Sequence, residues 1–337
     1  MTANSTEHIQ PTIIRDIQAG MSRVFALKAA MELDLFTPLR REPLSAGQLA
    51  EMVGVDAAKL GLLLYVLVFL GLLEVKKGKF SNSPEAQRFL VRGEPGYMGG
   101  AHSIWTEMLE AMFTTAESVR TGRAQAKMDY SAMSQERLGK VLRGLLSGAK
   151  AAGRALAATY DFSSYRTLVD VGGGSGGLAI GITEACPHLT ATVVDLPAVT
   201  PLTRRMIDEA GASNRIRVET ADLLAASLVG SYDVAVMRFV TQVLGAEENA
   251  RALANLAQGI RPGGIVYILA HVLEDSRLTP RQALMFNLTA LNIYDGGQSY
   301  TESEYRRWLT GAGFDDIAVK LTSLPDGSSV IIARRCR

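Results

Sequence analysis

The spacing of hydrophobic positions changes near Arg166 and divides the chain into a helical first half and an alternating second half. Apolar residues recur at helical spacing from Ile9 to Leu39, which predicts a helical start. In the second half, short apolar runs of strand length alternate with helical patterns. Further helices are expected at residues 46–52, 55–70, 101–121, 135–160, 178–184, 247–259 and 302–312. Strands are expected at residues 167–171, 190–194, 216–218, 234–237, 265–270, 316–321 and 329–333.

This order of elements predicts an α/β protein. Alternating strands and helices favour a doubly wound, Rossmann-like parallel sheet with helices on both faces. The last two strands follow one another without an intervening helix, so they are expected to form an antiparallel pair at the end of the sheet. A Pro262-Gly263-Gly264 turn is expected just before the strand that starts at Ile265.

The N-terminal region has the pattern of a winged helix. Ser45 and Gln48 have the spacing of a capping box and predict a helix start, and a second, strongly apolar helix follows. A hairpin is then expected with its turn near Gly78. The second helix carries Lys59 as its only cation, whereas a DNA-recognition helix needs polar and basic side chains. We therefore expect this helix to be hidden against its own domain or another subunit, as in a dimerisation module.

Composition excludes several other classes of protein. The 337 residues include 35 Lys and Arg and 34 Asp and Glu, a net charge of +1, which does not favour a nucleic-acid surface. Two cysteines, Cys186 and Cys336, give no disulfide framework, and the four histidines form no zinc pattern. The most apolar run, residues 62–73, is too short to span a bilayer, and the first residues do not resemble a signal peptide. We expect a cytoplasmic protein with no bound metal.

The stretch from Thr167 to Gly177 carries the strongest chemical signal. A buried strand runs into the turn Gly172-Gly173-Gly174-Ser175-Gly176, which opens a helix. The next strand ends in Asp195, nineteen residues after Gly176. Glycines let backbone N–H groups approach a ligand, and an acidic residue at this spacing accepts the hydroxyls of a ribose. The sequence therefore predicts a nucleoside site at this edge of the sheet.

Spacing alone leaves two cofactors open. Gly172, Gly174 and Gly177 satisfy the dinucleotide pattern, so NAD is not excluded. Asp170, inside the strand before the turn, is placed to bind the amine of a methionine moiety. The segment 219–223 follows the third strand and is placed to accept from an adenine amino group. Together with the Pro-Gly-Gly turn and the closing antiparallel pair, these features favour S-adenosyl-L-methionine.

The chain resembles the caffeic acid and acetylserotonin O-methyltransferase family, which are class I S-adenosylmethionine-dependent methyltransferases with an N-terminal winged-helix dimerisation domain. The resemblance covers nearly the whole chain and includes the glycine turn, the segment 194–197, Asp222-Leu223 and the segment 309–314. It implies three regions: a winged-helix-like dimerisation domain (1–100), helices that link the domains and cover the substrate (101–160), and a cofactor-binding methyltransferase domain (161–337).

The resemblance also assigns cofactor residues. Gly172 and Gly174 line the cofactor, Asp195 holds the ribose, Asp222 with Leu223 brackets adenine, and Leu196 is a further cofactor-binding residue. Arg238 falls where the family has a basic residue near the cofactor. Together with Asp170, these are the predicted cofactor-binding residues, and the reaction leaves S-adenosyl-L-homocysteine.

The catalytic segment departs from the family. The family sequence His-Asp-Trp follows the fourth strand, where this chain has Gln242 and Val243 in place of the His-Asp pair. The family's next acidic residue corresponds to His271, and a further glutamate corresponds to Ser299. A glutamine cannot take a proton at neutral pH. Gln242 and His271 are the candidate catalytic residues.

Three interpretations of this departure remain open. In the first, His271 deprotonates the acceptor hydroxyl. In the second, the acceptor is already acidic and needs no base, so that positioning and desolvation drive the displacement. In the third, methyl transfer has been lost and the cofactor is structural or electrostatic. Losing general-base help costs only about 10²–10⁴-fold, so transfer to an acidic acceptor survives it.

The acceptor is expected to be a small, largely apolar, cyclic specialised metabolite. A helical stripe of apolar residues and the segment that closes over the acceptor in the family are the candidate substrate contacts: Trp105, Met108, Phe113, Phe286 and Asn287. Oxygen is the expected acceptor atom, with carbon or nitrogen as alternatives. The chain is expected to form a homodimer through its N-terminal domain. A non-methylating pathway enzyme and a ligand-sensing dimer with a transcriptional role are the rival functions.

Overall fold

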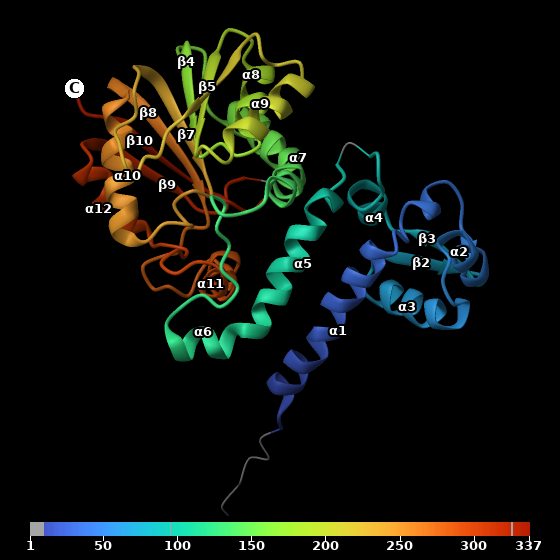
Figure 1. Cartoon of the computed structure of the whole chain (residues 1–337). Coiled ribbons are helices and arrows are strands. Elements are labelled where there is room, and N and C mark those ends of the chain that lie inside the picture. Colours follow the sequence, from blue (N-terminus) through green and yellow to red (C-terminus); the bar gives the residue numbers. More distant parts are fainter. Residues whose placement is uncertain (1–9, 95, 325) are drawn as a thin grey trace, which may run out of the picture. The chain divides into compact units, whose positions relative to one another are not determined.

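The computed structural model describes residues 10–94, 96–324 and 326–337. Contacts between residues divide the chain into two compact units, one ending at His102 and the other beginning at Ser103. Both units are drawn in Figure 1, and each is described by itself below.

The first unit is mainly helical and contains a small antiparallel sheet with strand order β1-β3-β2. The side chain of Ser45 accepts from the backbone N–H of Gln48, and the side chain of Gln48 accepts in return, so the predicted capping box is confirmed. The predicted order of helix, helix and hairpin is also present. The elements are α1 (Thr12–Glu32), η1 (Pro38–Arg40), β1 (Leu44–Ser45), α2 (Ala46–Val53), α3 (Ala57–Phe69), β2 (Leu73–Lys76), β3 (Lys79–Asn82), α4 (Pro84–Phe89) and η2 (Gly99–Ala101).

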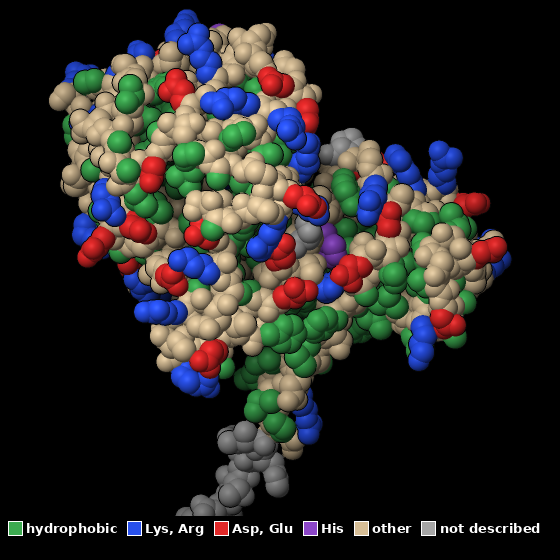
Figure 2. Space-filling view, in the orientation of Figure 1, with side chains coloured by type: hydrophobic (Ala, Val, Ile, Leu, Met, Phe, Trp, Pro, Cys, Tyr) green, Lys and Arg blue, Asp and Glu red, His purple; other side chains and the backbone are tan. Residues whose placement is uncertain are grey.

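The first unit leaves a large apolar surface exposed. Its core is closed by side chains such as Phe36, Leu64 and Leu67, which have no exposed surface. On the other side of α3, Leu62 and Phe69 are 69% and 79% exposed, so within one chain this helix is buried on one side only. Figure 2 shows hydrophobic side chains gathered over α1 and α3. On α1 they are Ile13, Ile14, Ile17, Met21 and Phe25.

The second unit is built on a seven-stranded sheet of order β6-β5-β4-β7-β8-β10-β9. The five strands from β6 to β8 are parallel, and β10 pairs antiparallel with both β8 and β9. The predicted doubly wound sheet with a terminal antiparallel pair is confirmed. Its helices are α5 (His102–Ala111), η3 (Met112–Thr114), α6 (Thr115–Thr121), α7 (Gln135–Thr159), α8 (Gly177–Ala185), α9 (Thr200–Glu209), α10 (Ala246–Gln258), α11 (Arg281–Ile293) and α12 (Glu302–Gly311). Its strands are β4 (Thr167–Val171), β5 (Thr190–Asp195), β6 (Ile216–Thr220), β7 (Tyr232–Arg238), β8 (Ile260–Ala270), β9 (Phe314–Lys320) and β10 (Ser329–Arg335).

Helices cover both faces of this sheet (Figure 1). Alternate strand residues enter different cores: Leu168 packs in the cluster that includes α7 and α8, whereas Val169 packs in the cluster that includes α10 and α12. Helices α7 and α8 approach closely because glycines face each other. A Cβ on Gly181 would lie 2.2 Å from the carbonyl oxygen of Lys150. The period-two burial of the strands therefore produces the three-layer arrangement.

The structure differs from the elements predicted by the sequence in several places. The expected turn at residues 262–264 lies inside β8, where the register with β7 shifts and Gly263 has a φ of +80°. Helices α4, α9 and α11 were not expected as separate helices. No single helix in the described part of the chain is long and apolar enough to cross a membrane; only the bent pair of α2 and α3 passes that test, and it does so jointly.

Candidate functional site

A cavity of about 550 Å³ lies within the second unit, at the carboxyl ends of the parallel strands. Strand β4 has β5 on one side and β7 on the other, so this is the point where the strand order reverses and where open α/β sheets bind ligands. The cavity brings together most of the residues that the sequence singled out. They are Met108, Gly172, Gly174, Asp195, Leu196, Asp222, Leu223, Arg238, Gln242, Phe286 and His271.

The glycine turn after β4 has a backbone that other residues rarely adopt. Gly172 and Gly174 have φ values of +64° and +54°. A Cβ on Gly172 would lie 2.5 Å from Cγ2 of Val240, so any side chain there would displace the opposite wall. Gly176, with a φ of +72°, starts α8. The turn therefore presents bare backbone to the cavity, as a nucleoside site requires.

Asp195 ends β5 and faces this turn. One carboxylate oxygen accepts from the backbone N–H of Gly174 at 2.7 Å, and the other accepts from the N–H of Leu196 at 2.7 Å. Burial raises the pKa of the Asp195 carboxyl, although these two backbone bonds act in the opposite direction. No ion pair found in the described ranges includes Asp195, and each of its oxygens keeps a lone pair. Two ribose hydroxyls are suitable donors for those lone pairs, so the partly buried carboxylate fits the predicted nucleoside.

Asp222 and Leu223 lie in the loop after β6. An Asp222 carboxylate oxygen accepts from the backbone N–H of Leu224 at 2.8 Å, which fixes the loop against the cavity. Leu223 is 9% exposed and packs into the core beneath. A carboxylate and an apolar side chain at one wall suit the amino edge and the face of an adenine ring.

Asp170 is placed beneath the glycine turn and does not line the cavity. One of its oxygens accepts from the N–H of Ala179 at 3.2 Å, and a Cβ on Gly173 would lie 2.8 Å from its Cγ. Its other oxygen is buried without a hydrogen-bond partner. Burial raises the pKa of Asp170 to about 7, with a smaller contribution from the neighbouring Asp195 and with the Ala179 N–H and Arg238 acting in the opposite direction. The structure therefore puts the turn between this carboxylate and the cavity.

Gln242 is held in one orientation by the chain itself. It is 1% exposed, and its side-chain oxygen accepts from the backbone N–H of His271 at 3.1 Å. If the amide were flipped, its NH₂ group would face that N–H donor, so the hydrogen bond fixes which end is oxygen. The NH₂ nitrogen is buried and has no partner.

The loop that carries Gln242 is fixed from several sides. The hydroxyl groups of Thr241 and Tyr305 lie 2.7 Å apart, and the side-chain amide of Asn249 donates to the Thr241 carbonyl at 2.9 Å. A Cβ on Gly297 would lie 2.2 Å from the backbone carbonyl oxygen of Gln242. The position of Gln242 therefore depends on close contact with residues far away in the sequence.

His271 follows β8 and lies between two aromatic rings. Its ring centroid is 5.0 Å from that of Phe239 and 5.2 Å from that of Phe286. Its Nδ1 is buried without a partner. Burial lowers the pKa of His271; the Arg238 cation lowers it as well, while Asp326 raises it. The imidazole is therefore neutral at pH 7 and has one nitrogen lone pair available.

Arg238 ends β7 beside these groups. Its guanidinium lies 4.3 Å from the centroid of the Phe239 ring and pairs with Asp326 at 3.2 Å. Its Nε is buried and has no partner. Arg238, Gln242 and His271 thus line one cavity, and each has a buried nitrogen without a hydrogen-bond partner.

The opposite part of the cavity is apolar and contains two residues that the sequence did not single out. Tyr130 and Tyr294 line it with Met108 and Phe286. Burial raises the pKa of both tyrosines, so both are neutral phenols. Tyr130 lies in an irregular loop with no hydrophobic period, and for this reason no local signal identified it.

Three predicted substrate residues do not line the cavity. Phe113 is 76% exposed, and Trp105 is partly exposed. Asn287 accepts from the backbone N–H of Ser299 at 2.6 Å, and the Ser299 hydroxyl donates to Ala283 at 2.9 Å. Asn287 and Ser299 therefore connect α11 to the chain that precedes α12.

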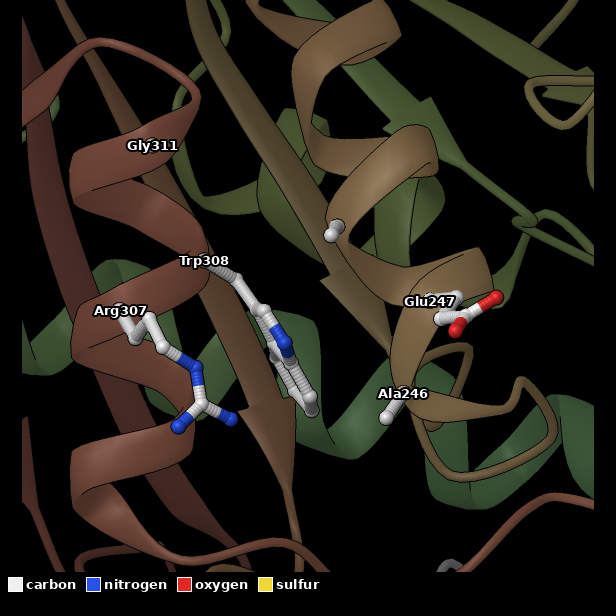
Figure 3. Close-up of a pocket in the computed structure, with 6 residues that line it drawn as sticks. Ala246, Glu247, Arg307, Trp308 and Gly311 are labelled. Atoms are coloured by element: carbon white, nitrogen blue, oxygen red, sulfur yellow. The ribbon is translucent and has the colours of Figure 1, made fainter.

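A second depression, of about 420 Å³, lies between α10 and α12 (Figure 3). Figure 3 shows the Trp308 ring extending from α12 toward Ala246 and Glu247 of α10, beside Arg307. Neither the glycine turn nor any of the unpartnered buried nitrogens lies at this depression. Within the described residues, no group of three or more His, Cys, Asp or Glu side chains is placed to hold a metal ion. The larger cavity is therefore the candidate site.

Comparisons with known proteins agree on one family. Residues 107–315 match the O-methyltransferase domain, and residues 16–92 match the O-methyltransferase dimerisation domain. The chain is 33% identical over 319 residues to the tetracenomycin polyketide synthesis 8-O-methyl transferase TcmO of Streptomyces glaucescens, covering 93% of each chain. It is 30% identical over 329 residues to the 3-hydroxy-5-methyl-1-naphthoate 3-O-methyltransferase of Streptomyces sahachiroi, covering 95% of this chain and 94% of that one. The crystal structure of human N-acetylserotonin methyltransferase with S-adenosylmethionine has the same fold, with a TM-score of 0.87, 24% identity and coverage of 99% and 100%.

Proposed function

Because the chain belongs to the O-methyltransferase family and is an S-adenosylmethionine-dependent methyltransferase, we propose that it methylates a hydroxyl group of a small aromatic or enolic specialised metabolite. The two relatives described above act, by their names, on a polyketide and on a hydroxynaphthoate. Both are described as methyltransferases, which gives no support to a non-methylating role for this chain. The apolar half of the cavity, with Met108, Phe286 and Tyr294, suits a flat and largely apolar acceptor.

We place the cofactor at the glycine turn. Asp195, with Leu196 beside it, accepts the ribose hydroxyls, and Asp222 with Leu223 holds the adenine ring. Gly172 and Gly174 allow close approach of the chain, and Arg238 supplies positive charge nearby. When bound, S-adenosylmethionine supplies a methyl group on a positively charged sulfur. The single observation that carries this proposal is the partly buried carboxylate of Asp195, which lines the cavity and is hydrogen-bonded to backbone N–H groups.

Asp170 acts from beneath the turn in this proposal. Its carboxylate is buried under Gly173, and it bonds to the first turn of α8. From that position it favours a positive charge above the turn, such as the amine of the methionine moiety. This role also accounts for a buried carboxyl with one oxygen unpartnered.

His271 and Gln242 act on the acceptor. The neutral imidazole of His271 offers a lone pair for the proton of the acceptor hydroxyl. Gln242 has no proton-accepting role, because amides are not bases at neutral pH. Its NH₂ group orients the acceptor. An acceptor that is already acidic needs little help from His271, so the two sequence-based interpretations that retain methyl transfer are compatible with one site.

We also propose that the protein is a homodimer of winged-helix-like N-terminal domains and acts in the cytoplasm, where S-adenosylmethionine is made. The matched dimerisation domain and the exposed face of α1 support the dimer. Replacing Ile17, which is 69% exposed, with Asp is expected to convert the dimer into a monomer in light-scattering chromatography. A wild-type monomer at micromolar concentration would contradict the dimer.

Methyl transfer is tested with S-adenosylmethionine that carries a deuterated methyl group and a panel of hydroxylated naphthalenes and polyketide-like aromatics. We expect S-adenosylhomocysteine and an acceptor product that carries the label on oxygen, identified by mass spectrometry and NMR. A label on carbon or nitrogen would contradict the assignment to oxygen. A DNA mobility-shift experiment is expected to be negative, and a sequence-specific shift would favour a transcriptional role instead.

A further inference from the structure

Gln242 and His271 each have one buried nitrogen without a hydrogen-bond partner, and the two nitrogens have opposite hydrogen-bonding roles. The Gln242 amide nitrogen is a donor only, and its oxygen is already occupied by the His271 backbone N–H. The Nδ1 of His271 has no partner, and the neutral ring offers a lone pair when its proton is on Nε2. Both residues line the same cavity, so a ligand that fills it lies against one residue with a free donor and one with a free acceptor.

The chain itself couples the positions of these two groups. The backbone of His271 fixes the amide of Gln242, and the side chain of His271 is held between the Phe239 and Phe286 rings. Neither side chain can turn to satisfy the other without giving up these contacts. Buried polar groups in folded proteins nearly always have partners, so an unpartnered donor and an unpartnered acceptor on two linked cavity residues point to a ligand that supplies both partners.

We propose, building on the methyltransferase function above, that Gln242 and His271 select an acceptor whose reacting hydroxyl has a carbonyl group beside it. The carbonyl oxygen accepts from the Gln242 NH₂ group, and the hydroxyl donates to Nδ1 of His271. An ortho- or peri-hydroxy aromatic ketone has this pattern, with an oxygen acceptor and an O–H donor a few ångströms apart.

This arrangement also explains why a glutamine is compatible with the reaction. In a free hydroxy ketone the hydroxyl donates to its own carbonyl, which holds the proton away from a base. Gln242 takes over the carbonyl oxygen, so the hydroxyl is released to face His271. A phenol without the carbonyl leaves the Gln242 donor buried and unsatisfied, and sites of this kind reject ligands that lack the matching group.

Binding to the protein saturated with S-adenosylhomocysteine tests the proposal without turnover. The probes are an ortho-acetyl naphthol and the matching ortho-ethyl naphthol, which differ in the carbonyl oxygen and little in shape. We expect the wild-type protein to bind the acetyl compound about 10- to 100-fold more tightly, as one hydrogen bond to a desolvated donor allows. Equal affinity of the two compounds for the wild-type protein, within twofold, would overturn the proposal.

Two variants locate the preference at Gln242. Gln242→Glu keeps an oxygen for the His271 N–H, and its second oxygen donates only when the carboxyl is protonated, so the preference for the acetyl compound is expected to weaken as the pH rises. Gln242→Met removes the amide and keeps the length, and it is expected to bring the two affinities within about threefold. The matched control is Gln258→Glu, the same change at an exposed position at the end of α10. Circular dichroism and thermal unfolding establish that each variant folds. A folded Gln242→Met protein that retains the wild-type preference would overturn the proposal.

Failure of this inference differs from failure of the methyltransferase function. If the labelled methyl group reaches both naphthols at similar rates and with similar affinities, the function holds and the carbonyl selection is wrong. If no label reaches either compound, nor any other member of the hydroxylated panel, the function itself fails.

Discussion

Replacing Asp195 with asparagine is expected to remove most of the affinity for the cofactor while leaving the fold in place. The two oxygens of Asp195 accept from two different backbone N–H groups, those of Gly174 and Leu196, each at 2.7 Å. An asparagine has one oxygen only, so its NH₂ group must face one of these donors. The change also removes a buried negative charge whose pKa is raised by burial, so the loss of a hydrogen bond is partly offset in the cofactor-free protein.

The effect on binding is larger because one ribose hydroxyl loses its acceptor and the other keeps only a neutral amide oxygen in place of a carboxylate oxygen. A hydrogen bond to an ionised group contributes about 1.5–3 kcal/mol, and the neutral amide retains one weaker bond at best. The expected loss of binding free energy is about 3–4 kcal/mol. At about 1.4 kcal/mol for each tenfold change, this corresponds to roughly 10²–10³-fold weaker binding.

Isothermal titration calorimetry with S-adenosylhomocysteine measures this loss. The control is Asp315→Asn, which changes an exposed carboxylate on β9 and is expected to bind as the wild type does. Thermal unfolding without ligand checks that Asp195→Asn folds, with an expected change in stability within about 1–2 kcal/mol. A folded Asp195→Asn protein that binds S-adenosylhomocysteine within threefold of the wild type would refute the ribose assignment.

Three further predictions follow from the site. Because burial lowers the pKa of His271, the acidic limb of the pH–rate profile is expected below pH 6.5. His271→Ala should remove this limb and slow turnover by about 10²–10⁴-fold. A limb centred above pH 6.5 would contradict a buried neutral base. Gly297→Ala is expected to lower the free energy of unfolding in urea by more than about 3 kcal/mol, because the new Cβ meets the backbone carbonyl of Gln242. The control Gly148→Ala, on an open helix surface, should be neutral or stabilising. Equal effects of the two changes would contradict the close contact between Gly297 and the Gln242 loop. The folded pKa of Asp170, about 7, lies above the unfolded value of 3.8, so the folded state binds more protons between these values and loses stability as pH rises from about 4 to 7. Asp170→Asn should therefore gain stability relative to wild type over that window, and a gain independent of pH would contradict the raised pKa.

The sequence predicted those parts of the site that lie directly at strand ends. Asp195 and the glycine turn are defined by their distance from β4 and β5, and parallel strands bring their carboxyl ends to one edge. The order of strands and the antiparallel end were predictable for the same reason. The start of β8 was not predictable. Gly263 has a positive φ, which is typical of a turn, but here it lies inside the strand at a shift in the register between β7 and β8.

Contacts between distant segments could not be predicted from local pattern. Tyr130 reaches the cavity because its loop hydrogen-bonds to the end of α11, as in the 2.9 Å bond from the N–H of Met128 to the carbonyl of Ile293. The orientation of Gln242 depends on the backbone of His271, 29 residues later. Phe113 shares a helical stripe with Met108, but the helix breaks into the 3₁₀ turn Met112–Thr114 and leaves Phe113 exposed. These placements depend on packing, which the spacing of residue types does not encode.

The most direct test of the central claim is a crystal structure of the protein with S-adenosylhomocysteine. We predict density for the ligand in the cavity at the carboxyl ends of β4 and β5, with both ribose hydroxyls within hydrogen-bond distance of the Asp195 carboxylate. Density for the ligand elsewhere, or a ribose that makes no contact with Asp195, would contradict the account.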